Sequence, residues 1–567
     1  MIEKCFYKIC FSPLSVNDPK FFGFSEFLAG LALMILAWTI ADVRYRFRVE
    51  VAPLPLKIIT FFVVVFVGLS TILTDLWRAS GWLVLSQTFI TSAIWQAFLG
   101  FTFFITFLIW IWFAFISPPV FGKLNSKYYM SAIYRYIIEG VSTNLVIIAD
   151  ELSYSAPQII KYAPERQTFQ KNDNTVKQEK INITQVEIHA HHLLDLIADK
   201  RFCRVIIESS PITALAFFEE ISDQNKYNVN IPIFARNIVN EAISNKESFI
   251  YHEAEWYDSG FIGEAKPITQ ALFSNFDMVE SIETMFDAPF LKWDADQWEA
   301  YSRVVLITIE SLSSKRLINH NYTIYHAIDN LEKSVTDLNK LNGVINLWEN
   351  DTYQRLRVAI NFIEKFLKLL EEKNANEKIK LRSIGKENFY SDRTIYDHLA
   401  NMLFEIISKA SFIKNSTEYW TIYYNTIWSE FFNFYTFNSY VGKAFKFKLR
   451  RLIYNEILRM NEFPNFQGAA LLGFCLYLFG FKINKNSEDY RDTVALHTVV
   501  LNWTKKNFAA LYDFNPRVAE QCLIDNMTYD HEKRRITRAF TGNPLKREIT
   551  YYHFDVDPPH ENFKKFD

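Results

Sequence analysis

The sequence predicts a mainly α-helical protein with three N-terminal transmembrane helices, a juxtamembrane helical stem and a large cytoplasmic helical body that contains a small α/β portion. Three observations predict this class. Residues 79–122 carry no charge, and two shorter apolar segments precede them. The rest of the 567-residue chain has an ordinary soluble composition, with apolar residues three or four apart.

The three expected spans are residues 21–41, 58–76 and 92–116. Each is close to the length that an apolar helix needs to cross a hydrocarbon core of about 30 Å. Residues 81–91 are expected either to lie along the outer interface or to extend a tilted third helix, which Pro118 and Pro119 end. We therefore assign residues 1–122 to a transmembrane region.

Basic residues between the spans predict the orientation. The first loop contains Arg44, Arg46, Arg48 and Lys57, whereas the second contains Arg78 alone. The positive-inside rule then places the N-terminus outside and the C-terminal body in the cytoplasm. We expect a multi-pass protein of the cell membrane, which is the inner membrane if the source is bacterial.

A polar stripe follows one face of the expected third span. Thr88, Ser92 and Gln96 recur at helical spacing and continue to Gly100. Small and hydroxyl residues on a transmembrane helix favour helix packing, and this is our interpretation. The alternative is a pore lining, which would require an oligomer.

The remaining chain divides by composition. We expect a stem over residues 123–164, with Gly140 or Pro157 as breaks, and a polar linker over 165–180. A mixed α/β subdomain follows over 181–290, with a short strand at 202–207. A helical domain over 291–530 is expected to form a bundle or an irregular solenoid-like stack, and a tail over 531–567 carries a strand near 549–556.

Several function classes lack support in the sequence. The net charge of −2 gives no reason to expect nucleic acid as a partner. The five cysteines are scattered and form no CxxC pair. No phosphate-binding loop, dinucleotide fingerprint, GxSxG elbow or HExxH motif is present. We predict no cofactor other than a divalent metal at the first site below.

The first candidate site is a histidine cluster. His189, His191, His192 and Asp195 are residue types that ligate zinc or iron, with one helical turn between His191 and Asp195. On a strand, His189 and His191 would share a face. The alternative is an amphipathic helix whose polar faces are solvated.

Two further clusters are candidates. His252, Glu253, Glu255 and Asp258 precede a glycine-containing loop and suggest a ligand or acid–base site, or else an exposed acidic edge.

A basic stretch interleaved with aromatic residues suggests binding of anionic lipid or a nucleotide, or else lysines that snorkel from a core. Its residues are Lys443, Lys446, Lys448, Arg450 and Arg451.

These patterns favour an interaction or sensor protein tethered to the membrane over an enzyme. The expected partners are the lipid bilayer and either a second copy of the chain or another protein. One alternative is an oligomeric channel or membrane-perturbing effector with a stress or defence role. The other is a membrane-anchored, metal-dependent enzyme that uses the histidine cluster.

Overall fold

The computed structural model describes residues 4–6, 9–13, 20–40, 42–85, 91–165, 183–258, 268–288, 292–312, 321–373, 394–414, 418–432, 437–485, 490–541 and 549–559. The described chain is mainly helical, as the sequence predicts. It divides into two compact units, residues 1–241 and residues 242–567. The expected linker at 165–180 lies almost wholly outside the described residues, and the expected domain boundaries stay predictions.

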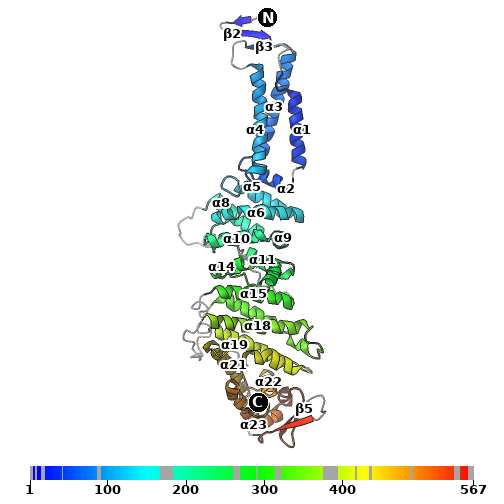
Figure 1. Cartoon of the computed structure of the whole chain (residues 1–567), viewed down its shortest axis with the longest axis vertical. Helices are drawn as coiled ribbons and strands as arrows, with labels where there is room; N and C mark the ends of the chain where they lie inside the picture. The colour runs from blue at the N-terminus through cyan, green and yellow to red at the C-terminus, as the bar shows by residue number, and fades with distance from the viewer. Residues whose placement is uncertain are drawn as a thin grey trace. The chain divides into compact units, whose positions relative to one another are not determined.

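The first unit contains a bundle of apolar helices (Figure 1): α1 (Phe24–Ile40), α3 (Leu56–Ala79) and α4 (Ser92–Ile111), which continues as the π-helical turn η1 (Trp112–Ile116). Among the described residues, two helices are long and apolar enough to cross a membrane, Leu56–Ala79 and Ser92–Ile116. Their 24 and 25 residues rise about 36 Å each. The apolar part of α1, Phe24–Leu36, is shorter.

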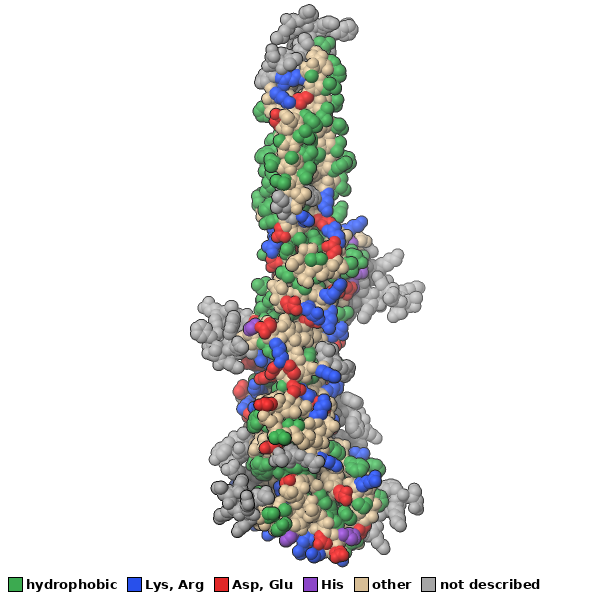
Figure 2. Space-filling view, turned by 90° about the vertical axis from the view of Figure 1, so that its right-hand side faces the viewer, with side chains coloured by type: hydrophobic (Ala, Val, Ile, Leu, Met, Phe, Trp, Pro, Cys, Tyr) green, Lys and Arg blue, Asp and Glu red, His purple; other side chains and the backbone are tan. Residues whose placement is uncertain are grey.

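The outer surface of this bundle is apolar. Only 22% of the apolar window of α3 and 17% of that of α4 is buried. Figure 2 shows hydrophobic side chains along the bundle and charged side chains gathered toward its two ends. A helix in water normally buries its apolar face, whereas most of the apolar window of these two helices is exposed.

Glycines let phenylalanine rings sit between the three helices. The pairs are Phe27 on Gly68, Phe103 on Gly30 and Phe22 on Gly100. A Cβ atom on these glycines would lie 3.0, 2.9 and 3.2 Å, respectively, from the nearest ring atom. Small residues that admit a neighbour's side chain are a common means of packing transmembrane helices. Each of the three helices therefore has a glycine that contacts a phenylalanine ring.

The uncharged stretch 79–122 is not one helix. Helix α3 ends at Ala79, and Gly81 adopts φ +60° in the turn that follows. Residues Leu83–Leu85 then form β3, which pairs with β2 (Ile9–Pro13), and β2 pairs with β1 (Lys4–Phe6). The expected continuation of a tilted helix through 81–91 is thus wrong where the structure describes it, because glycine and a strand interrupt the chain.

Two stem helices follow the bundle. They are α5 (Ser126–Glu139) and α6 (Ser142–Tyr162), and the short α2 (Val43–Glu50) packs against both. Gly140 separates them with φ +68°, which confirms the predicted break there. Pro157 lies inside α6 and does not end it.

Residues 202–207 form a helix, so the predicted strand is wrong. They belong to α9 (Lys200–Ser209), which lies between α8 (Gln185–Ile197) and α10 (Pro211–Asp223). The Asp199 carboxylate caps α9 by accepting from the backbone N–H groups of Arg201 and Phe202. The cap and the packing against α6 and α10 outweigh the strand preference of the β-branched residues.

Helix α11 (Pro232–Ser244) spans the division between the units. The second unit is mainly helical, and its helices follow one another in a stack (Figure 1). Its helices are α12 (Phe249–Asp258), α13 (Ile268–Phe273), α14 (Phe276–Ile282), α15 (Ala295–Ser311), α17 (Tyr322–Lys333), η2 (Leu338–Leu341), α18 (Asp351–Glu372), α19 (Ile395–Ala410), η3 (Thr421–Trp428), α20 (Ser429–Phe432), α21 (Tyr440–Arg459), α22 (Phe466–Phe479), α23 (Tyr490–Phe514) and α24 (Pro516–Gln521). In the described part of 181–290, every regular element is helical.

A three-stranded antiparallel sheet follows α24. It has the order β4 (Met527–Asp530), β5 (Arg535–Thr541), β6 (Ile549–Asp555). The strand predicted near 549–556 is therefore confirmed. Phe554 of β6 packs on Phe481, with ring centroids 5.6 Å apart, and Ile536 of β5 is fully buried.

Candidate functional site

At the N-terminal end of α1, side chains from α3 and α4 cap the helix. The Phe24 N–H donates to Asp75 Oδ2 at 3.0 Å, and the Phe21 N–H donates to Gln96 Oε1 at 2.9 Å. Lys20 also pairs with Asp75, at 3.2 Å. These bonds satisfy backbone groups that an apolar surrounding would leave without a partner.

This cap gives the polar stripe a structural role. Gln96 is 1% exposed and faces the start of α1, so it contributes to helix packing within a single chain. Its Nε2 atom has no hydrogen-bond partner among the described residues. Ser92 begins α4, and Thr88 lies outside the described residues. The packing interpretation of the whole stripe stays a prediction.

At the opposite end of the bundle, a buried ion pair joins three segments. Arg48 of α2 donates from Nε to Glu151 Oε2 at 2.9 Å and from Nη2 to Oε1 at 2.7 Å, and Nη1 donates to the Ala114 carbonyl at 3.1 Å. Arg48 is 9% exposed and Glu151 5%. The hydrogen bonds to Glu151 raise the pKa of Arg48 despite its burial. The pair thus ties α2 and α6 to the end of α4.

Asn125 makes a second connection at this level. Its Nδ2 donates to the carbonyls of Val51 at 2.8 Å and Val120 at 2.9 Å, and its Oδ1 accepts from the Gly122 N–H. The Phe121 N–H donates to Ser155 of α6. The chain that leaves α4 and the chain that enters α3 are therefore held together. Neither Glu151 nor Asn125 is a predicted site residue, and no motif marks them.

The histidine cluster lies on α8, and its members point to different partners. His189 Nδ1 is 2.9 Å from Ser126 Oγ, whereas His191 Nε2 is 3.4 Å from Asn230 and 3.9 Å from Asp195. Burial lowers the pKa of both histidines. His189 and His191 do not share a face because α8 is a helix, so the arrangement expected on a strand is wrong.

The described histidine and aspartate side chains of α8 do not converge as a set of metal ligands. Among the residues that the structure describes, no three histidine, cysteine, aspartate or glutamate side chains are placed to hold a metal ion. His192 and Asp195 instead line a groove of about 410 Å³ between α5 and α8. The geometry around His189, His191, His192 and Asp195 is that of a helix held by polar contacts to its neighbours.

The second predicted cluster divides into one exposed and one structural residue. His252 is exposed and 3.9 Å from Glu247. Glu253 is buried, and its carboxylate accepts from the N–H groups of Ile268 at 2.6 Å and Thr269 at 2.8 Å. It therefore caps α13. The side chains of Glu255 and Asp258 lie outside the described part of the chain.

The basic stretch of α21 is largely internal. Lys446 is 1% exposed and pairs with Asp492 at 2.8 Å, and Lys448 is 7% exposed and pairs with Asp397. Arg450 donates to backbone carbonyls, and burial lowers its pKa. The half-buried Asp492 and Asp397 thus give Lys446 and Lys448 structural partners, and a lipid or nucleotide site at these lysines stays a prediction. Lys443 and Arg451 are exposed.

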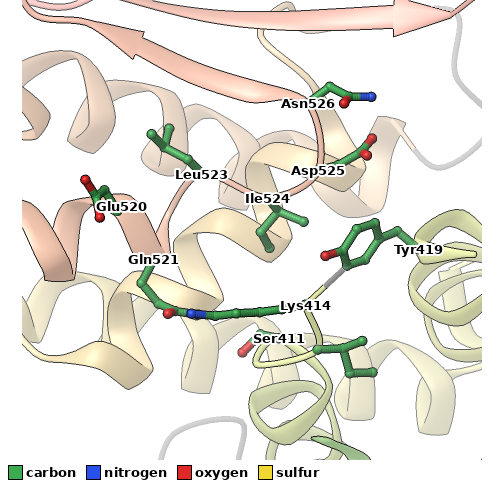
Figure 3. A pocket seen from close by; sticks show the side chains of 10 residues that line it. Ser411, Lys414, Tyr419, Glu520, Gln521, Leu523, Ile524, Asp525 and Asn526 are labelled. Atoms are coloured by element: carbon green, nitrogen blue, oxygen red, sulfur yellow. The ribbon is translucent and has the colours of Figure 1, made fainter. Parts of the chain in front are cut away.

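The second unit contains a cavity that no motif predicts. Its volume is about 440 Å³, and two segments line it (Figure 3): Ser411, Ile413, Lys414 and Tyr419, and Glu520 to Asn526 apart from Cys522. The lining combines one lysine, two carboxylates and a phenol, which suits a polar ligand. The two segments are about a hundred residues apart in sequence, so only folding brings them together.

Neither a protein-family model, nor a curated protein, nor a solved structure matches this chain.

Proposed function

We propose that α1, α3 and α4 form a three-helix membrane anchor and that the chain is a tethered interaction protein. The observation that carries the proposal is the apolar outer surface of two helices that are long enough to span a bilayer. The shorter α1 joins them through the glycine contacts, and Asp75 and Gln96 satisfy its first backbone groups. These contacts support α1 as a third span.

In this proposal the N-terminus is outside and the body is cytoplasmic. Basic residues at the end that carries α2 support the orientation, since the exposed Arg46, Lys57 and Lys127 and the half-buried Arg44 all lie there. Arg48 lies at the same end, where it pairs with Glu151 inside the protein.

Exposed apolar side chains on the second unit support an interaction role. Ile345 is 92% exposed and Trp348 58% exposed in the loop after η2. The Arg357 guanidinium lies 5.3 Å from the centre of the Trp348 ring. Tryptophan and arginine dominate binding hot spots in protein interfaces. We propose a second copy of the chain as the partner of this loop.

Membrane insertion is tested by alkaline carbonate extraction of membranes that contain the full chain, followed by protease treatment of sealed vesicles. We expect the chain to stay in the pellet, and the C-terminal body to be cleaved only when the cytoplasmic face is accessible. Release by carbonate would refute the anchor. Cleavage of the body from the outer face would refute the orientation.

The partner is tested by chemical cross-linking of the full chain in its membrane. We expect a dimer that Ile345→Ser with Trp348→Ala removes. Ile212→Ser changes an exposed apolar residue of the first unit, 64% exposed, and is the matched control. An unchanged dimer in the double variant would exclude this loop as the contact.

A further inference from the structure

The start of α5 presents lysines and apolar side chains together on the surface. We call Lys123, Leu124, Lys127 and Tyr128 the basic exit face. Leu124 is 80% exposed and Tyr128 47% exposed, and both lysines are exposed. The opposite face of α5 is buried, with Tyr129 and Ile133 fully enclosed. The helix therefore cannot turn the basic exit face inward without exposing its own core.

The position of this face is set by the end of the bundle. The apolar turn η1 ends at Ile116, and α3 begins at Leu56. Asn125 bonds to Val51, five residues before α3, and to Val120, four residues after η1. The headgroup layer on one side of a bilayer is about 5–8 Å deep. If the bundle spans a bilayer, the first turn of α5 lies beside that layer.

Neighbouring charges leave the two lysines available. Lys57 pairs with Glu50 at 3.5 Å, and Arg135 pairs with the same carboxylate. Within the described residues, neither Lys123 nor Lys127 forms a salt bridge or a hydrogen bond. The side chains near Lys127 include His189, whose pKa is lowered by burial, by His192 and by Lys127 itself. The two lysines therefore keep their charge for a ligand outside the protein.

The surface is also continuous with the apolar bundle. Ile116 is 61% exposed and Val120 44% exposed, and they lead along the chain to Leu124. The groove of about 410 Å³ begins at Met130 and Ser131, one helical turn beyond Lys127 on the same side of α5. A leucine at the acyl boundary and lysines at the phosphate level suit an amphiphile with an anionic group.

We propose that the basic exit face binds the phosphate group of an anionic phospholipid in the leaflet next to α5. This inference rests on the proposed membrane anchor. It differs from the lipid contact expected at residues 443–451, where Lys446 and Lys448 are buried. Two juxtamembrane lysines favour an anionic over a zwitterionic lipid by roughly tenfold or more.

The test uses the full chain in nanodiscs that contain phosphatidylcholine and phosphatidylglycerol in equal amounts. Native mass spectrometry counts the lipids that stay bound after the protein is released from the nanodisc. We expect phosphatidylglycerol to be enriched by roughly tenfold, and the double variant Lys123→Gln with Lys127→Gln to lose the enrichment. The matched control is Lys365→Gln with Lys506→Gln, which removes the same charge from exposed lysines of the second unit and should keep the enrichment.

Two results separate this proposal from the anchor. Wild-type protein that resists carbonate extraction but shows no enrichment, or a double variant that keeps it, would overturn the lipid site and leave the anchor standing. Protein that carbonate releases would overturn both. Leu124→Ser serves as a second variant, because an exposed leucine does not support the fold; we expect it to weaken lipid retention with unchanged thermal unfolding.

Discussion

Arg48 and Glu151 form a two-point ion pair at the end of the apolar bundle, with both side chains almost excluded from solvent. The residues are 103 positions apart, and the pair joins α2 to α6. A neighbouring pair, Arg44 with Asp150 at 2.6 Å, is about one third exposed on both sides. Arg44 Nε also lies 3.5 Å from Glu151 Oε1, so Glu151 pairs with both arginines, whereas Asp150 pairs with Arg44.

We expect Glu151→Ala to destabilise the first unit by about 3–5 kcal/mol, because it leaves the buried Arg48 guanidinium without its carboxylate. Asp150→Ala should cost less than about 1 kcal/mol, since an exposed pair contributes little. Thermal unfolding of the detergent-solubilised chain measures both. Equal effects of the two substitutions would show that burial of the Arg48 pair is unimportant.

Gly68→Leu should weaken the bundle, because a side chain at this position meets the Phe27 ring. Overpacking of this kind costs about 1–3 kcal/mol, and the added Phe27→Ala change should restore part of the loss. Gly122→Ala is the control, since its Cβ would have no neighbour closer than 3.7 Å. The readout is the unfolding temperature in detergent. A Gly68 variant as stable as the control would argue against ring-on-glycine packing.

Asp492→Ala should destabilise the second unit by about 3 kcal/mol, because the buried Lys446 ammonium would lose the Asp492 carboxylate. Replacing the exposed Lys443 by alanine should have almost no effect on stability. Denaturant unfolding followed by tryptophan fluorescence distinguishes the two. If loss of Asp492 is harmless, Lys446 must reach another acceptor or solvent.

Glu332 makes the stability of the second unit depend on pH. Burial and the charges of Glu405 and Asp329 raise the pKa of this carboxyl to about 7 from a usual value near 4.5. The folded protein then binds more protons than the unfolded chain between these two values, so its stability should fall as the pH rises from about 4.5 to about 7.

Glu332→Gln removes this titration. We expect the variant to be more stable than the wild type by roughly 1–2 kcal/mol above pH 7.5, after allowance for partial exposure, and nearly equal to it at pH 4.5. Thermal unfolding at several pH values measures the difference. Lys333→Gln, on the neighbouring exposed position, is a charge-changing control that should not remove the slope. A wild-type slope that persists in Glu332→Gln would assign it to another group.

Local patterns predicted much of the secondary structure. Hydropathy predicted the apolar segments near α1, α3 and α4. Glycine predicted the break at Gly140, and alternation of side chains predicted the strand β6. Each of these signals depends only on residues that are close together in the sequence. Other elements were not predicted, among them strand β3 and the helices α9 and α23. Helix α9 has β-branched residues typical of a strand, but its cap and its packing decide the outcome. Helix α23, the longest described helix, was not predicted as a separate element.

The candidate site residues were predicted less well, for a physical reason. A lysine or glutamate has the same identity in a sequence whether it is solvated or buried in a pair. Lys446 looks like part of a surface cluster until Asp492 is placed beside it. Glu253 looks like an acid–base candidate until it caps α13.

The sequence by itself determined where the long uncharged stretch and its apolar neighbours lie, because hydropathy is a property of contiguous residues. Only the tertiary structure decided how the stretch is divided and what its polar residues do. A turn and a strand separate α3 from α4, Gln96 caps α1, and Glu151 neutralises Arg48. Each of these contacts joins positions that are distant in the chain, and their energies depend on burial, which arises only when the helices pack.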